Sequence, residues 1–391
     1  MNVLPPQSLI SLGLALALIL GSRSASDRAR TAIAAGCLIA LLALALALPL
    51  QQRIRMGDVG TYTASRENFD RYMGTLAVRF EAHLSTVLLP FIDRALGATA
   101  ETPAQAFVVL SRIAAGWYVA MLLVATWSER FSPAALRYAG LCVATPATLL
   151  YFGYRELGYL SLNAAAFPLM AAGLRGVRGR LEAGCALAGL GAALHGFGVL
   201  SLAGAAAAAA VAKVRAIDRA RFAAQAFAYG TSFYLVWVFV YVVALKLQIL
   251  PGHAETIPWR PLLVSRLAEH RVNFPIVSAR GAADLLVMAW MVGVPLLVVV
   301  AAAARRSAAD VRVATAYSVP SLAFLVAFWP IQGVAVEADL VFAAFPAIYA
   351  IIWVVASRPW TTWVSVAVLV SAHVVFWLVM LGEYFVNSRV S

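Results

Sequence analysis

Long apolar runs alternate with short polar connections along the whole chain. A helix needs about 20 apolar residues to cross the hydrocarbon core of a bilayer. The runs that approach this length cover residues 3–21, 31–50, 104–126, 134–152, 157–174, 181–195, 197–212, 222–245, 282–304, 313–329, 340–356 and 360–381. This pattern predicts an all-α, polytopic membrane protein with about 12 transmembrane or re-entrant helices, in which residues 1–391 form a single transmembrane domain.

The basic residues predict how these helices are oriented. They fall on alternate connections, at Arg23, Arg28 and Arg30; Arg130 and Arg137; Arg175, Arg178 and Arg180; Lys213, Arg215, Arg219 and Arg221; Arg305, Arg306 and Arg312; and Arg358. Short loops rich in Lys and Arg remain on the cytoplasmic side, so we expect these connections inside and both termini outside. The alternation requires residues 181–212 to pass twice, as a broken or re-entrant pair interrupted at 195–198.

Two long connections, 51–103 and 246–281, then share the outer face with a shorter one at 330–339. The first contains apolar residues at helical spacing, namely Leu76, Phe80, Leu84, Val87, Leu88 and Phe91. Charged residues stand between them, which predicts an amphipathic helix lying along the membrane surface at about 76–95.

Composition agrees with a membrane protein and excludes other classes. The chain is 63% hydrophobic and only 12% charged, far from the proportions of soluble domains. Its formal net charge of +12 comes mostly from arginines in short connections, so we expect no nucleic-acid partner. Cys37, Cys142 and Cys185 lie in apolar runs and are expected to pack rather than form disulfides or bind metal. The chain has no phosphate-binding loop for nucleotides, which argues against nucleotide-driven transport.

Asp58 is the first candidate for chemistry. It opens the first long outer connection, with Arg55 before it and Tyr62 one helical turn after it. A carboxylate at this place could act as a general base or orient an acceptor hydroxyl. The alternative is an ordinary turn residue, because Asp beside Gly57 is common in turns.

A second candidate group lies at the outer ends of the middle helices. Arg155 could clamp a phosphate through its planar guanidinium, and Glu156 could hold a sugar hydroxyl or a divalent metal. The alternative is a charge pair at a helix end that reaches the interface. His195, at the predicted break, could bind a lipid pyrophosphate or a sugar, whereas a lone His on an apolar helix is otherwise a core residue.

Further polar residues gather on the predicted outer face. Glu81 and His83 lie on the interfacial helix, where a solvated position is the alternative. Arg260 and Arg271, in the second outer connection, could bind a lipid-linked phosphate, and Glu337 and Asp339 could bind sugar or metal. The alternative for these four is a solvated loop or an acidic outer end.

This arrangement resembles the GT-C superfamily of membrane glycosyltransferases and the related polysaccharide polymerases of the Wzy and EpsG kind. The resemblance covers residues 30–215 and consists of Arg55-Met56-Gly57-Asp58 with Tyr62 in the first outer loop, interfacial helices after it, Arg155 and His195. It differs in two places. Val59 follows Asp58 where many GT-C enzymes have a second acid, and the acidic Glu337 and Asp339 stand where EpsG-like polymerases have a basic residue.

The resemblance implies a transferase that moves a sugar from a polyprenyl-phosphate or pyrophosphate carrier to an acceptor at the outer face of the cell membrane. Asp58 and Glu156 would be catalytic, and the other ten candidates would bind substrate. The acceptor could be a glycan, a lipid or a protein. The resemblance implies no definite cofactor, and a divalent metal is left open. The alternatives are a Wzy- or EpsG-like polymerase, a secondary transporter or lipid flippase, and a structural membrane subunit.

Overall fold

The computed structural model describes residues 6–47, 92–97, 99, 101–145, 157–194, 198–212, 220–221, 223–232, 308–332 and 339–381. Throughout these ranges the regular structure is helical, with no strand. The principal helices are α1 (Pro6–Gly21), α2 (Asp27–Ala47), α6 (Thr102–Ser128), α7 (Pro133–Ala144), α9 (Leu157–Leu174), α10 (Arg180–Leu194), α11 (Gly198–Val211), α16 (Ala308–Gln332), α17 (Asp339–Ala356) and α18 (Pro359–Leu381). The all-α prediction is therefore confirmed for the part of the chain that the structure describes.

Most predicted helix bounds lie within a few residues of the observed ones. The run 157–174 coincides with α9, and the predicted break at 195–198 falls between the end of α10 and the start of α11. The predicted runs 222–245 and 282–304 lie largely or wholly outside the described residues, as does most of the interfacial helix. Of that helix, the structure describes one helical turn at 92–95.

The run 134–152 differs from the prediction, because α7 ends at Ala144. Thr145 follows in an extended conformation, with φ −69° and ψ 120°. Pro146 comes next in the sequence, and its ring disfavours helical geometry in the residue before it. The apolar composition of this run gave no sign of the helix end, which follows from the steric effect of Pro146 on Thr145.

Two helices, α2 with 21 residues and α6 with 27 residues, are long and apolar enough to cross a membrane. Less than a third of the apolar stretch of each is buried inside the bundle. Large apolar side chains such as Leu16, Ile39 and Leu123 are exposed on α1, α2 and α6. Shorter apolar helices accompany them at 9–21, 161–174, 198–211 and 344–356. The total of about 12 spans is not confirmed.

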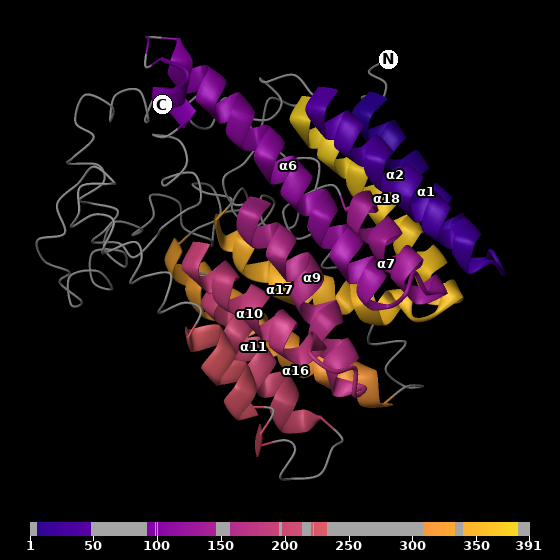
Figure 1. Ribbon diagram of the computed structural model, residues 1–391, viewed down its shortest axis with the longest axis vertical. Coiled ribbons are helices and arrows are strands. Elements are labelled where there is room, and N and C mark those ends of the chain that lie inside the picture. The colour runs from indigo at the N-terminus through magenta and orange to yellow at the C-terminus, as the bar shows by residue number, and fades with distance from the viewer. Residues whose placement is uncertain are drawn as a thin grey trace, which may run out of the picture.

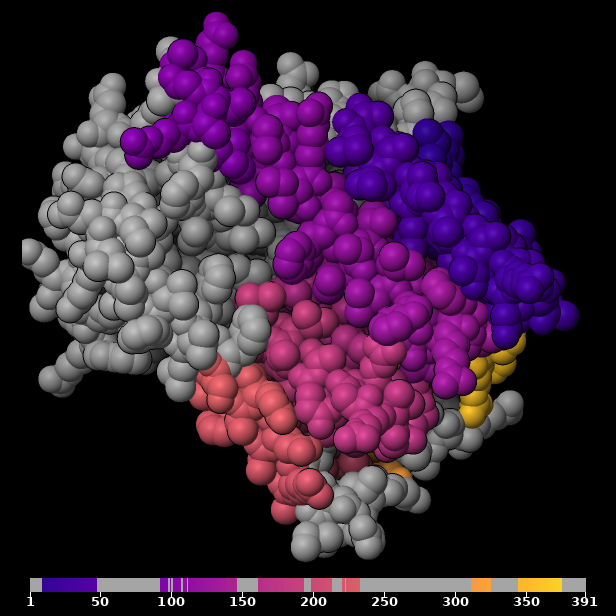
Figure 2. Space-filling model, viewed as in Figure 1, coloured from indigo at the N-terminus to yellow at the C-terminus, as the bar shows by residue number. Residues whose placement is uncertain are grey.

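Two helices occupy the centre of the bundle. α7 packs against α1, α2, α6, α17 and α18, and α17 packs against α7, α9, α11, α16 and α18. Every residue of α7 from Ala135 to Ala144 is buried. Figure 1 shows α1, α2 and α18 beside α7, with α9, α10, α11 and α16 grouped on the other side of α6. The visible surface of α6 borders that of α9 and α10 (Figure 2).

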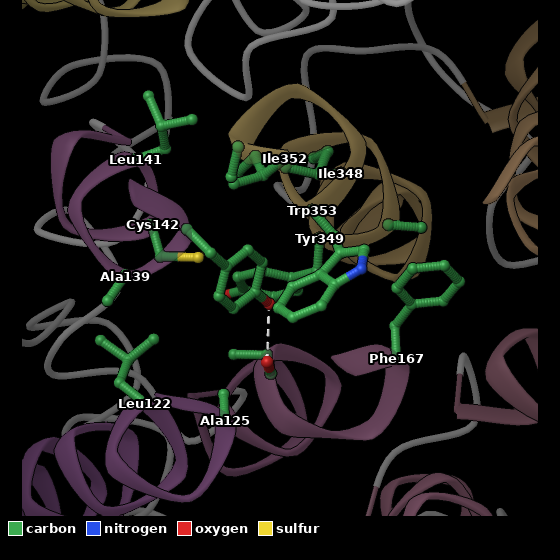
Figure 3. Close-up of a cluster of buried hydrophobic side chains, with 14 of the residues drawn as sticks. Leu122, Ala125, Ala139, Leu141, Cys142, Phe167, Ile348, Tyr349, Ile352 and Trp353 are labelled. Carbon is green, nitrogen blue, oxygen red and sulfur yellow. Dashed lines mark hydrogen bonds between the residues drawn. The ribbon is translucent and has the colours of Figure 1, made fainter. Parts of the chain in front are cut away.

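The core between α7, α9 and α17 is built around aromatic rings. The ring of Tyr138 meets that of Trp353 edge to face, with centroids 5.2 Å apart. The Tyr138 hydroxyl donates a hydrogen bond of 2.6 Å to the carbonyl of Ala164. Figure 3 shows Trp353 in this cluster, flanked by Phe167 of α9. A buried Tyr needs such an acceptor, and here the backbone of the neighbouring helix α9 supplies it.

Small residues bring the remaining helices into close contact. A Cβ atom on Gly198 would lie 2.2 Å from the backbone nitrogen of Ala192, so α10 and α11 touch through their backbones. A Cβ atom on Gly204 would lie 2.4 Å from the carbonyl oxygen of Tyr317 in α16. In the Ala-rich run 203–212, Ala205, Ala208 and Ala209 are buried and form a close-packing face.

Replacing Gly204 with Ala should destabilise the bundle. The new methyl group would collide with backbone that cannot rotate away, and such overpacking typically costs about 1–3 kcal/mol. The matched control is Gly116→Ala in α6, because a Cβ atom there meets nothing within 4 Å. That control should be neutral or stabilising, since Ala favours a helix over Gly by about 1 kcal/mol. Thermal unfolding in detergent measures both, and equal midpoints for the two variants would contradict the packing argument.

Candidate functional site

The residues predicted to form the site lie almost entirely outside the described residues. This group comprises Arg55, Asp58, Tyr62, Glu81, His83, Arg155, Glu156, His195, Arg260, Arg271 and Glu337. Asp339 is the first residue of α17, and its side chain is not among those described. The structure can therefore be used to place the helix ends that flank these residues, and the predicted roles stay predictions.

One end of the bundle is defined by the connections 22–26, 129–132, 175–179 and 357–358, and we call it the basic end. Direct contacts tie these connections together. Arg30 donates from Nε to the carbonyl of Phe131 at 3.1 Å, and Arg175 forms an ion pair with Glu129. Phe131 has a positive φ of 53°, a conformation that is unfavourable for a bulky side chain, so the bond from Arg30 helps to hold this turn.

Further contacts join the fourth connection to the others. The buried Arg137 donates from Nε to the carbonyl of Ala356 at 2.7 Å and from a terminal nitrogen to that of Ser357 at 3.2 Å. The guanidinium of Arg23 lies 5.7 Å from the ring centroid of Trp363. Four of the connections predicted to be cytoplasmic therefore lie at one end (toward the lower right of Figure 1).

The helix ends that flank the predicted site lie at the opposite end of the bundle. The connections at the basic end join consecutive helices, so the far ends of those helices point away from the basic end. These far ends are the last residue of α2, the first residues of α6, α9 and α17, and the junction of α10 with α11. In the sequence, Glu156 directly precedes α9, His195 directly follows α10, and Asp339 begins α17.

Asp93 is a buried acid at this opposite end, and sequence reasoning gave it no role. Its carboxylate is 4% exposed and accepts a hydrogen bond from the hydroxyl of Thr102, the first residue of α6. The Thr102 hydroxyl also lies 2.9 Å from the carbonyl oxygen of Thr99. Gly97, with φ +96°, allows the chain to turn between them. The sequence feature that could have indicated this contact is the acid Asp93 shortly before a helix that begins with Thr102 and Pro103.

The end of α7 lies inside the bundle and is fully capped. At 1.5 Å per residue its 12 residues span about 18 Å, less than the roughly 30 Å of a hydrocarbon core. Each of its last four carbonyl oxygens bonds to a side chain. The pairs are Leu141 with Thr145 at 3.0 Å, Cys142 with Tyr118 at 3.4 Å, Val143 with Ser11 at 2.8 Å and Ala144 with His373 at 2.8 Å. Helices α1, α6 and α18 thus satisfy carbonyls that have no partner within α7.

His373 was not predicted as a polar contact, although sequence reasoning discussed His195. It is 1% exposed and bonds through Nε2 to the carbonyl of Ala144, so Nε2 must carry the proton. Its Nδ1 has no hydrogen-bond partner in the described part of the chain. Position 373 lies inside an apolar run, and nothing in that run signals a carbonyl opposite it.

A second buried polar group joins α9, α11 and α16. Ser201 donates a hydrogen bond to the side-chain oxygen of Asn163, and Tyr317 lies beside Ser201 without reaching hydrogen-bond geometry. Ser321, one turn further along α16, also has an unpartnered hydroxyl among the described residues. The ring of Phe167 covers Tyr317, with centroids 4.9 Å apart. This uncharged group suits a neutral polar partner, such as water or a sugar hydroxyl, better than an ion.

Metal ligands do not gather in the part of the chain that the structure describes. No group of three His, Cys, Asp or Glu residues there could hold a metal ion. Cys37, Cys142 and Cys185 are free thiols and are buried within helices, as predicted. The question of a divalent metal near Glu156 or Glu337 falls on residues outside the described ranges.

Comparison of the chain with protein-family models, with curated proteins and with solved structures found no match. The argument for function therefore depends on the residues themselves and on the way the helices place them.

Replacing His373 with Leu should destabilise the end of α7. The Ala144 carbonyl would lose its donor, and an unsatisfied buried polar group costs about 1–3 kcal/mol. Ser371→Ala in the same helix is the control, because the Ser371 hydroxyl bonds only to the carbonyl of Val368 within α18. The unfolding midpoint should fall for His373→Leu and stay near wild type for Ser371→Ala. A His373→Leu midpoint at or above that of wild type would show that the cap is dispensable.

Glu129 predicts a dependence of stability on pH. Burial raises the pKa of its carboxyl group, and Arg175 and Arg180 offset this only in part. A raised pKa means that the folded state binds the proton more tightly, so this stabilisation is complete below about pH 4 and is lost as pH rises through the folded pKa. Relative to wild type, Glu129→Gln should therefore gain stability between about pH 4 and pH 7. Unfolding midpoints across this range measure it, with the exposed Glu101→Gln as control.

Proposed function

We propose that this chain is a multi-pass integral membrane glycosyltransferase that uses a sugar carried on a polyprenyl phosphate or pyrophosphate. It transfers the sugar to an acceptor at the outer face of the cell membrane. The observation that carries the proposal is the polarity of the bundle. Four basic connections meet at one end, and the helix ends nearest in sequence to Arg155, Glu156, His195 and Asp339 point away from it.

This polarity fits an enzyme that works at one membrane surface. By the positive-inside rule the basic end faces the cytoplasm, so the candidate residues face outward. Exposed apolar surface on α2 and α6 gives the carrier lipid a place beside the bundle.

In the reaction, Asp58 accepts the proton of an acceptor hydroxyl, or orients that hydroxyl, as its oxygen attacks the anomeric carbon. The bond from that carbon to the carrier phosphate breaks, and the phosphate leaves with the electron pair. Arg155, with Arg260 or Arg271, stabilises the charge on the departing phosphate. Glu156 and His195 position the sugar, and Tyr62 binds substrate. Phosphate is a fair leaving group, so positioning and charge stabilisation suffice without a covalent intermediate.

A polymerase of the Wzy or EpsG kind would use the same chemistry with a growing glycan as acceptor. A secondary transporter or flippase is favoured by one observation, the half-length helix α7, because transporters build midplane sites from interrupted helices. The last four carbonyls of α7 already bond to Thr145, Tyr118, Ser11 and His373, which supports a structural role for this break.

Asp58→Asn and Arg155→Ala should each abolish sugar transfer while leaving expression and folding intact. Loss of a general base lowers a rate by about 10²–10⁴-fold. The measurement is incorporation of radiolabelled sugar from lipid-linked donors into acceptors, in membrane vesicles that contain the full chain. Arg28→Ala is the control, since its side chain is exposed and lies at the basic end, away from every candidate residue.

Three outcomes separate the alternatives. Loss of transfer in both variants with normal folding supports the transferase. Loss of transbilayer lipid movement without loss of transfer identifies a flippase or transporter. Normal transfer and normal lipid movement in both variants leaves a structural subunit, and either of these last two results overturns the proposal.

A further inference from the structure

The basic end carries a surface whose chemistry the proposed reaction does not use. It is formed where the C-terminal ends of α6 and α9 meet the start of α10, and we call it the Trp127 patch. Its residues are Trp127, Glu129, Arg130, Arg175, Val177, Arg178, Arg180 and Glu182. With four arginines and two glutamates, its formal charge is +2. Trp127 is 55% exposed and Val177 is 46% exposed, so apolar and basic surface lie side by side.

Arg180 is held in place by Trp127. Its guanidinium carbon lies 4.2 Å from the centroid of the Trp127 ring, within the range of a cation–π contact. Stacking uses the flat face of the guanidinium and leaves the N–H groups along its edge available as donors. Arg180 is thus oriented for an acceptor that approaches from the side.

The neighbouring arginines differ in how they are engaged. Arg175 forms its ion pair with Glu129 and lies 6.0 Å from the ring centroid of Trp353. Arg178 is exposed and has no ion-pair partner in the part of the chain that the structure describes. The turn that carries it contains Gly176 and Gly179, with φ +89° and +75°, so Arg178 stands on a tight loop between α9 and α10. Arg178 and Arg180 therefore remain as donors for an anion.

The location identifies the anion. Trp127 is the penultimate residue of α6, one of the two helices long and apolar enough to cross a membrane. A Trp at the end of a spanning helix lies at the level of the lipid head groups. Basic clusters between helices at the cytoplasmic side bind anionic head groups. Val177 and the exposed ring of Trp127 would contact the upper part of the acyl chains, which a soluble anion lacks.

We propose that the Trp127 patch binds the phosphate group of an anionic phospholipid in the adjacent leaflet. Arg178 and Arg180 donate to the phosphate oxygens, and Trp127 orients Arg180 from beneath. The site depends on α6 crossing the bilayer and is independent of sugar transfer.

The test uses the full-length protein purified in neutral detergent, with bound lipid counted by native mass spectrometry. Phosphatidylglycerol is the probe and phosphatidylcholine the neutral comparison. Wild type should bind phosphatidylglycerol more tightly than phosphatidylcholine. The double variant Arg178→Gln/Arg180→Gln should bind it about 30-fold more weakly, the loss expected for two arginines at a membrane surface. This variant keeps the pair of Arg175 with Glu129.

The control is the double variant Arg28→Gln/Arg94→Gln, which removes the same charge from two exposed positions outside the patch. Its binding should stay within about twofold of wild type. Equal binding of the two lipids, or an equal loss in both double variants, would overturn the proposal, because the attraction would then be general. Displacement of phosphatidylglycerol by inorganic phosphate would also overturn it, since the site would then prefer a soluble anion. Sugar transfer by the Arg178→Gln/Arg180→Gln variant reports separately on the proposed enzyme.

Discussion

Arginine side chains join the connections between helices at one end of the bundle. They do so by bonding to backbone carbonyls or to a carboxylate of a neighbouring connection. Arg137 is the strongest case, because it is buried and reaches two carbonyls where α17 turns into α18. A buried guanidinium is tolerable only when its donors are used, so the turn and α7 must stay together. Two further arginines link other connections to the one between α6 and α7. Arg30 joins the α1–α2 connection to it through the carbonyl of Phe131, and Arg175 joins the α9–α10 connection to it through the carboxylate of Glu129.

Between the two ends, the helices approach by removing side chains and by capping exposed backbone. Gly198 and Gly204 let α10, α11 and α16 touch through their backbones, which gains dispersion contacts where lipid offers no hydrophobic driving force. Where a helix ends inside the bundle, its last backbone carbonyls lack partners within the helix, and leaving them unbonded would cost stability. At the end of α7 that cost is met by a separate side chain for each carbonyl, which is why the break at Thr145 can lie among apolar helices.

How much the sequence could predict follows from the range of each interaction. Helix bounds depend on local composition, and the run 157–174 matched α9 because charged residues mark both of its ends. Four of the six basic connections were also predicted to share one end, because arginines mark them, and their contacts confirm it. To predict the end of α7, the steric effect of Pro146 on the residue before it had to be given more weight than the apolar run that continues past it. His373 and Tyr138 find their carbonyl acceptors on helices far away in sequence, and no local pattern announces such a partner. The candidate acids and arginines, from Asp58 to Glu337, stay predictions.

The separation of charge along the bundle also bears on the kind of chemistry the chain can perform. A transporter has to expose one site to both sides in turn, and it needs ionisable or open backbone groups near the midplane. At the end of α7, the described groups that bond to its carbonyls are the hydroxyls of Thr145, Tyr118 and Ser11 and the Nε2 of His373. The acids Asp93 and Glu129 lie at opposite ends of α6. Because each of the last four carbonyls of α7 is bonded to a side chain, the break after α7 leaves no open backbone acceptor there for a transported ion.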